Sequence, residues 1–217
     1  EAMKSYASSE ASGLSELVER FLSDQGATVS AACFGIAGPV TGGTVRATNL
    51  PWMISESEIA ERFGLERVSL INDLMATGYS VPVLRDSELH VLNAGEADPG
   101  GAVGLVAPGT GLGVGLIVVT DGCCRPLPSE GGHVEFAPKD RREIDLLLHL
   151  LRRMPHVSVE RLASGPGLFT IYSWLKEYRN HEEPVWLTRR IESADPSEAV
   201  SETALEEKDS VAVEALE

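Results

Sequence analysis

The pair Asn72-Asp73 stands where a short apolar run at residues 67–71 gives way to a helical pattern at residues 74–80. Open α/β sheets bind ligands at such junctions, beyond the carboxyl ends of their strands. An aspartate there can accept the proton of a substrate hydroxyl, and an asparagine can bridge neighbouring hydroxyls. Asp73 could instead serve only as the N-cap of the helix, and taken alone the pair favours that capping role.

A glycine-rich stretch, Pro108-Gly109-Thr110-Gly111-Leu112-Gly113, lies between two apolar runs, which predicts a strand, a tight turn and a second strand. Successive N–H groups in such a turn can hold anionic oxygens, and Thr110 adds a hydroxyl donor. An ordinary glycine-rich hairpin would have the same pattern. The stretch has neither the Gly-Lys-Ser/Thr of a P-loop nor the G-x-G-x-x-G spacing of dinucleotide folds. A nucleotide-binding dehydrogenase is therefore disfavoured.

The segment Glu130-Gly-Gly-His133 has the E-x-x-H spacing of di-iron helices. Two consecutive glycines make a helix improbable and no second copy exists, so we predict no metal site. On an extended glycine loop the same residues could offer a carboxylate and an imidazole to a polar ligand such as a sugar. Glu160, taken alone, has the pattern of a surface carboxylate.

Composition narrows the class of protein. The chain has 217 residues, of which 43% are hydrophobic and 24% charged, enough for one large domain or two small ones. Its formal charge of −15 argues against partners such as nucleic acid or an anionic membrane. No apolar run approaches the roughly 20 residues of a membrane span. Three cysteines without zinc-type spacing suit reduced thiols, and we expect a cytoplasmic protein.

Strand and helix patterns alternate along the chain, which is typical of an α/β fold. Ser55 and Glu58 form a capping box at the start of one helix, and Gly64 suits its end. We place a domain boundary in the turn-rich residues 93–101. Helix 143–153 is predicted to have Ile144, Leu147, Leu148 and Leu151 on its inner side. The predicted elements are helix 14–25, strands 28–34 and 44–48, helix 55–63, strand 67–71, helix 74–80, the glycine hairpin, a turn at Asp121-Gly122, a strand ending near Leu127, helices 143–153, 158–163 and 165–178, an irregular stretch 180–196 and a last helix 203–217.

Four segments together resemble one protein family. They are Leu-Ile-Asn72-Asp73, Pro108-Gly109-Thr110-Gly111-Leu112-Gly113, Ser129-Glu130-Gly-Gly-His133-Val-Glu-Phe136 and Val159-Glu160-Arg161-Leu-Ala-Ser-Gly-Pro-Gly167. In this order they resemble the bacterial glucokinases of the hexokinase and actin-like ATPase superfamily, and the third and fourth form a specific pair. The resemblance implies an α/β, two-lobed actin-like ATPase (ribonuclease H-like) fold. Its small lobe would span residues 1–98 and its large lobe residues 99–217.

The resemblance also implies the roles of the site residues. Asp73 would be the base toward the glucose 6-hydroxyl, and Asp73 and His133 would face one cleft between the lobes. The partners would be glucose and ATP with Mg²⁺, and a homodimer is one assembly open to the protein. The remaining sugar contacts would be Asn72, Glu130, His133 and Glu160, and the ATP phosphates would be lined by Gly109, Thr110 and Gly111.

Two motifs of the resembled family are missing. The family opens with an Asp-x-Gly-Gly-Thr phosphate loop, which Gly42-Gly43-Thr44 imitates with Val40 in place of the aspartate. It closes with a glycine-rich adenosine-binding segment, for which this chain has no counterpart. We therefore expect an internal fragment, incomplete at both termini, that lacks about 30 residues before Glu1 and on the order of 100 after Glu217. Alone, such a fragment is expected to be inactive.

The function that these patterns favour is ATP-dependent phosphorylation of glucose at its 6-hydroxyl. One alternative is a non-catalytic sugar-binding or regulatory module of the same fold, and another is a kinase for a different hexose. The presence of Asp73 favours a kinase, because binding needs only hydrogen bonds whereas phosphoryl transfer benefits from a base.

Overall fold

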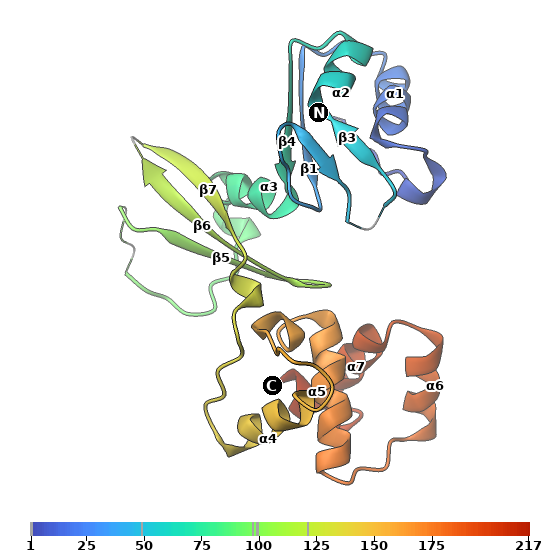
Figure 1. The fold of residues 1–217 in the computed structure, drawn as a ribbon, viewed down its shortest axis with the longest axis vertical. Helices are drawn as coiled ribbons and strands as arrows, with labels where there is room; N and C mark the ends of the chain where they lie inside the picture. The colour runs from blue at the N-terminus through green and yellow to red at the C-terminus, as the bar shows by residue number, and fades with distance from the viewer. Residues whose placement is uncertain (1, 49, 97, 99, 121) are drawn as a thin grey trace. The chain divides into compact units, whose positions relative to one another are not determined.

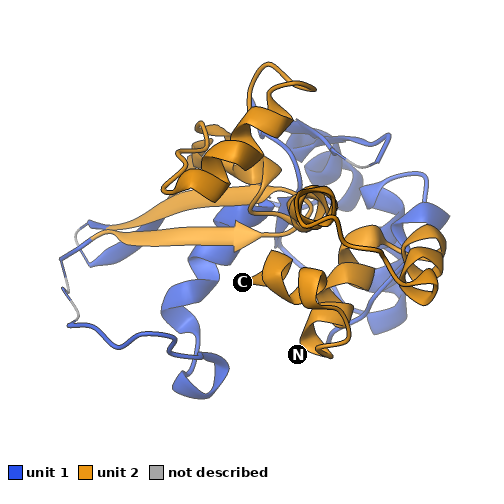
Figure 2. Cartoon of the chain, turned by 90° about the horizontal axis from the view of Figure 1, so that it is seen from below, with its two compact units in different colours: residues 1–101, 119–126 blue, residues 102–118, 127–217 orange. Residues whose placement is uncertain are grey.

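The structure is a computed structural model that describes residues 2–48, 50–96, 98, 100–120 and 122–217 (Figure 1). The chain forms two compact units (Figure 2). Unit 1 contains Glu1–Gly101 and Val119–Pro126, and unit 2 contains Ala102–Val118 and Leu127–Glu217. No helix within the described residues is both long and apolar enough to cross a membrane.

Unit 1 is built on two parallel strands, β1 and β4, whose register places Ile36 opposite Asn72. Both strands therefore end at the same edge, and helix α3 starts there directly after β4 (Figure 1). Strands β2 and β3 form an antiparallel hairpin. The elements are η1 (Ser8–Glu10), α1 (Leu14–Gln25), β1 (Ala31–Ile36), β2 (Thr44–Arg46), β3 (Met53–Ser55), α2 (Glu56–Phe63), β4 (Arg67–Asn72), α3 (Asp73–Ser80), η2 (Val81–Val83) and η3 (Asp86–Glu88).

Local signals in the sequence account for the helix ends of unit 1. The Ser55 side chain accepts a hydrogen bond from the Glu58 backbone N–H at 3.4 Å, as the predicted capping box requires. Gly26 and Gly64 have φ values of 56° and 63°, the left-handed conformation that ends helices α1 and α2. The core of this unit consists of Val45, Ala47, Trp52, Ile54, Ile59, Leu65 and Leu70.

Unit 2 contains the predicted glycine hairpin. Strands β5 and β6 pair antiparallel from Val103 opposite Ile117 to Pro108 opposite Leu112. Strand β7 belongs to the same sheet, and the end of β6 and most of β7 fall in the segment Val119–Pro126 that is assigned to unit 1. Asp121, part of the predicted turn after β6, lies outside the described residues. The elements after residue 102 are three strands followed by helices. In chain order they are β5 (Val103–Pro108), β6 (Leu112–Thr120), β7 (Cys123–Ser129), η4 (Gly131–His133), α4 (Arg141–Leu150), η5 (Val159–Arg161), α5 (Gly165–Tyr178), α6 (Val185–Ser193), α7 (Pro196–Leu205) and α8 (Ser210–Leu216).

Helix α5 is the central helix of unit 2 and contacts α4, α7 and α8 (Figure 1). It contributes three large side chains, Tyr172, Trp174 and Leu175, to the core. The buried residues of this core are Leu146, Leu150, Val157, Leu162, Tyr172, Trp174, Leu175, Leu187, Val200, Ala204, Val211, Ala212 and Ala215.

Two predictions for the final helices were wrong. Residues 180–196 are not irregular, because they contain helix α6 after Pro184. Only Leu187 of that helix is buried, so no apolar stripe identified it in advance. The predicted helix 203–217 is broken between α7 and α8, where Glu207 has a φ of 54°. Asp209 then restarts the helix by accepting hydrogen bonds from the N–H groups of Val211 and Ala212.

The predicted inner face of helix α4 was wrong for three of its four residues. Ile144, Leu148 and Leu151 are exposed, and only Leu147 packs, partly buried, against the core. Leu146 and Leu150 are buried instead. Helix α4 thus has apolar residues on two faces, and the periodic pattern alone could not tell which of them meets the core.

A partly buried carboxylate network joins helices α5 and α6. The Glu183 carboxylate, 12% exposed, accepts hydrogen bonds from Tyr172 at 2.7 Å, Lys176 at 3.0 Å and Thr188 at 2.7 Å. Burial raises the pKa of Glu183, but the bonds from these three donors outweigh it, so the net pKa lies below the ordinary value of 4.5. The network therefore stabilises the ionised form of Glu183.

Replacing Glu183 with glutamine is expected to lower the free energy of unfolding by about 1–3 kcal/mol at neutral pH. Because the folded-state pKa is lowered, the carboxylate's contribution is complete above about pH 4.5 and is lost as the pH falls through the folded-state pKa. Urea denaturation of both proteins should therefore show a difference that shrinks below pH 4.5. The neighbouring exposed Glu182→Gln is the control, and an equal effect of both variants would contradict the network's role.

Candidate functional site

Asn72 and Asp73 occupy the junction of β4 and α3 in unit 1, as predicted. The N-cap of α3 is Asn72, whose Oδ1 accepts a hydrogen bond from Leu74 N–H at 3.0 Å, while its Nδ2 donates to the Gly38 carbonyl at 3.3 Å. The expectation that Asp73 is the N-cap was therefore wrong. The backbone of Asn72 is extended, with φ −65° and ψ 151°, and this conformation decides which of the two residues caps the helix.

Asp73 is the first residue of helix α3, and its side chain is exposed. Its Oδ1 accepts a hydrogen bond from Leu74 N–H at 2.9 Å, and its Oδ2 makes no hydrogen bond with other residues that the structure describes. Since the helix dipole favours negative charge at this end, Asp73 is suited to present a carboxylate oxygen to a ligand. Its role as a base, and that of Asn72 as a sugar contact, stay predictions.

The glycine turn, residues 109–111, connects β5 to β6 in unit 2 and confirms the predicted hairpin. The turn is closed by a hydrogen bond from Gly109 N–H to the Gly111 carbonyl at 2.8 Å. Thr110 is exposed at its tip, and within the described part of the chain the N–H groups of Thr110 and Gly111 have no acceptor. Two free amides and a hydroxyl can therefore donate to an anionic ligand.

Glu160 lies on η5, and its side chain is 28% exposed. Its Oε2 accepts a hydrogen bond from Leu112 N–H at 2.9 Å, just after the glycine turn. Its Oε1 lies 3.7 Å from His133 Nδ1. Glu160 is thus a half-buried carboxylate between the glycine turn and His133, and the surface position that its local sequence suggested was wrong.

Glu130 immediately precedes one turn of 3-10 helix, η4, whose last residue is His133, so the predicted extended loop was wrong. His133 N–H donates to the Glu130 carbonyl at 3.0 Å, and His133 Nε2 lies 3.6 Å from the Glu130 carboxylate. Both side chains are mostly exposed and can meet a ligand. The turn packs tightly on β6, because a Cβ atom on Gly132 would lie 2.2 Å from the Leu112 carbonyl oxygen.

Two further residues support this cluster and were missed by the sequence-based reasoning. Ser164 Oγ donates to the Glu160 carbonyl at 2.7 Å and accepts from Gly167 N–H at 3.1 Å, so it joins η5 to the start of α5. His156 Nε2 lies 3.1 Å from the His133 carbonyl oxygen, to which it donates. A serine before Gly-Pro-Gly is a recognisable helix cap, whereas nothing in the spacing around His156 indicates its contact.

The residues of unit 2 can do two kinds of chemistry side by side. Glu130, His133 and Glu160 offer acceptors and a donor to the hydroxyl groups of a sugar. The adjacent glycine turn offers donors to phosphate oxygens. Among the described residues, no group of His, Cys, Asp and Glu side chains is arranged to hold a metal ion.

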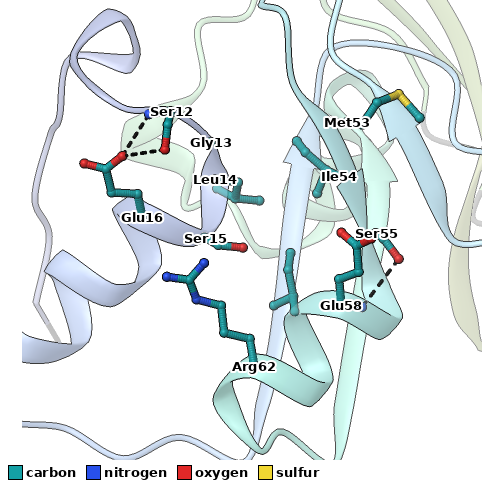
Figure 3. A pocket seen from close by; sticks show the side chains of 11 residues that line it. Ser12, Gly13, Leu14, Ser15, Glu16, Met53, Ile54, Ser55, Glu58 and Arg62 are labelled. Atoms are coloured by element: carbon teal, nitrogen blue, oxygen red, sulfur yellow. Dashed lines mark hydrogen bonds between the residues drawn. The ribbon is translucent and has the colours of Figure 1, made fainter.

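Two cavities lie outside this polar cluster. The first, about 460 Å³ in unit 1, lies between the start of α1 and the β3–α2 junction (Figure 3). Its polar groups largely bond one another, since Glu16 accepts from Ser12 and Ser55 accepts from Glu58. The second, about 780 Å³ in unit 2, has mostly apolar walls and borders the cluster at Val159. Neither cavity contains a predicted site residue.

The fold is a mixed α/β fold of the kind found in sugar kinases. A glucokinase from an Antarctic psychrotroph has a similar structure, with a TM-score of 0.81 and 30% identity over 97% of this chain and 63% of that chain. A ROK family glucokinase from Streptomyces griseus, solved in complex with glucose and AMPPNP, has a TM-score of 0.56 and 22% identity over 93% of this chain and 62% of that chain. At that identity the second likeness shows the fold alone.

Residues 1–217 match the sequence model of the family described as Glucokinase. The glucokinase of Nostoc punctiforme is 32% identical over 99% of this chain and 67% of its own length. That of Tolumonas auensis is 39% identical over 80% of this chain and 54% of its own length. The chain therefore belongs to the glucokinase family, and it spans between about half and two thirds of the length of these curated relatives.

Proposed function

We propose that the full-length protein phosphorylates glucose at its 6-hydroxyl with ATP. The observation that carries this proposal is the position of Glu160, whose carboxylate contacts the backbone beside the glycine turn and lies near His133. The carboxylate that would bind the sugar and the turn that would bind the phosphates are thus neighbours in one unit. Membership of the glucokinase family supports the same substrates.

Glu130, His133 and Glu160 would bind the hydroxyl groups of glucose, together with Asn72. Carboxylates accept hydrogen bonds from sugar hydroxyls, and a carboxylate can accept from two adjacent hydroxyls at once. His133 can donate to or accept from a ring hydroxyl, depending on its tautomer. A site of this kind selects for the hydroxyls it pairs with, because a missing hydroxyl leaves a protein group without its partner.

Asp73 would act as the base toward the glucose 6-hydroxyl. As the hydroxyl oxygen forms its bond to the γ-phosphorus, the Asp73 carboxylate accepts the hydroxyl proton, and the bond to the β–γ bridging oxygen breaks to release ADP. The free N–H groups of Thr110 and Gly111 fit phosphate oxygens, so this turn would hold the ATP phosphates with Gly109. Magnesium bound together with ATP would supply neutralisation of the phosphate charge.

The larger organisation belongs to the same proposal. The two lobes of an actin-like ATPase would correspond to residues 1–98 and 99–217, completed by further segments of the full-length protein. We place the protein in the cytoplasm, and a homodimer is one assembly open to it. The division into two lobes is supported by the motifs and by family membership.

A coupled assay for glucose 6-phosphate tests the proposal. The full-length protein is expected to form this product from glucose, ATP and Mg²⁺, with lower kcat/KM for mannose and other hexoses. The 217 residues alone are expected to show no measurable turnover, because the aligned residues cover only 54% to 67% of the length of these curated relatives. Robust product formation by the 217 residues would contradict that expectation. Glucose binding without turnover by the full-length protein would instead indicate a sugar-binding module, and preference for another hexose would correct the substrate.

A further inference from the structure

The Glu160 carboxylate has its two oxygens in different surroundings. Oε2 accepts the hydrogen bond from Leu112 N–H at 2.9 Å, at the point where the glycine turn becomes strand β6. Oε1 faces His133 Nδ1 at 3.7 Å, on the side of the sugar-binding cluster. Glu160 thus contacts Leu112, which lies 48 positions earlier in the sequence, and also His133 on a third segment, η4.

Gly111 makes room for this carboxylate. A Cβ atom on Gly111 would lie 2.5 Å from Glu160 Oε2, closer than real Cβ atoms pack, and 3.3 Å from its Cδ. Gly111 is not among the glycines with a left-handed φ, so its backbone would accept any residue. Position 111 therefore needs a glycine because the Glu160 carboxylate occupies the space of a side chain, and not because the turn requires a left-handed backbone.

Hydrogen bonds from the start of helix α5 hold the backbone around this contact. Gly165 N–H donates to the Gly109 carbonyl at 2.8 Å, and Ser164 Oγ donates to the Glu160 carbonyl at 2.7 Å. The start of helix α5 thus ties down both the glycine turn and the backbone of Glu160. The Glu160 side chain can still change its rotamer. That rotamer determines whether Leu112 N–H has a hydrogen-bond acceptor.

We propose that Glu160 is a positioning residue for the glycine turn, in addition to its sugar contact, and so couples sugar binding to nucleotide binding. The proposal rests on the proposed function for the identity of the two ligands. A sugar that hydrogen-bonds to Glu160 fixes its rotamer, which also fixes the acceptor of Leu112 N–H. The nucleotide then meets a turn that is already ordered, so each ligand raises the affinity for the other by the same factor.

Two alanine substitutions in the same turn test the coupling in the full-length protein. Gly111→Ala must displace the Glu160 carboxylate, whereas a Cβ atom on Gly109 meets nothing within 4 Å. Both variants alter the nucleotide turn, so the measurement is glucose affinity by calorimetry without nucleotide. We expect Gly111→Ala to raise the glucose Kd roughly 10- to 100-fold through the loss of a charged hydrogen bond. Gly109→Ala should leave it within about two-fold. Equal effects of the two variants, or none, would overturn the proposal.

Because the coupling acts equally on both ligands, nucleotide affinity provides a second measurement. In the wild-type protein, saturating glucose is expected to tighten the binding of a non-hydrolysable ATP analogue by roughly five-fold or more. In Gly111→Ala this factor should fall to about one. An unchanged factor in Gly111→Ala would also overturn the coupling, whatever the absolute affinities.

Hydrogen exchange of the Leu112 amide tests the positioning role without any ligand. Exchange is expected to speed up in Glu160→Ala and to stay slow in Glu160→Gln, because the glutamine oxygen can still accept from Leu112 N–H. If the wild-type protein does not bind glucose, the proposed function is wrong. Hydrogen exchange then still tests whether Glu160 holds the Leu112 amide. A Leu112 amide equally protected in Glu160→Ala would contradict the positioning role.

Discussion

Replacing Asp73 with asparagine should lower kcat for glucose phosphorylation by roughly 10²- to 10⁴-fold while changing the glucose KM little. A base acts in the transition state, so its loss reduces turnover more than substrate binding. Asparagine keeps an oxygen that can accept from Leu74 N–H, the bond that Asp73 Oδ1 makes at 2.9 Å, so helix α3 should still begin at the same residue. Steady-state kinetics of the full-length protein measure both constants.

The exposed carboxylate Glu61 on helix α2 provides the matched control for this variant. Glu61→Gln removes the same charge from the same unit and is expected to leave kcat within about two-fold. A rise in KM with unchanged kcat for Asp73→Asn would show that Asp73 is a sugar ligand and not the base. Equal loss of kcat in both variants would point to net charge as the cause.

Replacing Gly132 with alanine should abolish glucose binding and destabilise unit 2. The new Cβ would lie 2.2 Å from the Leu112 carbonyl oxygen, a backbone atom of β6 that cannot turn away as a side chain can. Overpacking of this kind costs about 1–3 kcal/mol of unfolding free energy and sometimes more. It also moves η4, and with it Glu130 and His133, away from Glu160.

Urea denaturation and glucose calorimetry measure the two effects of Gly132→Ala. Gly104→Ala in β5 is the control, since a Cβ atom there meets nothing within 4 Å, and its stability should change by no more than about 0.5 kcal/mol. Normal glucose affinity in Gly132→Ala would show that the position of η4 against β6 does not matter for sugar binding.

The parts of the fold that the sequence could predict are those with local signals. The capping box of Ser55, the left-handed Gly64 and the hairpin around the glycine turn each depend on residues a few positions apart. Helix α6 had only a weak signal, because Leu187 is its one fully buried residue and Ile191 packs against the core only partly buried. The outward face of α4 was mistaken for the inner one because packing, not periodicity, decides between two apolar faces.

The candidate site likewise has residues that a local pattern could predict and contacts that it could not. Asn72 and Asp73 could be placed at a strand end from the pattern of residues 67–80, although both are good helix caps and only the backbone conformation assigns the cap to Asn72. The contact of Glu160 with Leu112 N–H spans 48 residues, and no local pattern encodes it. The close approach of Gly132 to β6 likewise depends on the packed fold.

The most direct test of the central claim is to identify the product of the full-length protein by phosphorus NMR. With glucose, ATP and Mg²⁺, the expected result is glucose 6-phosphate and ADP in equal amounts, and almost none of either from Asp73→Asn. Phosphate carried on any other hydroxyl of the sugar, or ADP released with free phosphate and no sugar phosphate, would contradict the assignment of Asp73 as base toward the 6-hydroxyl.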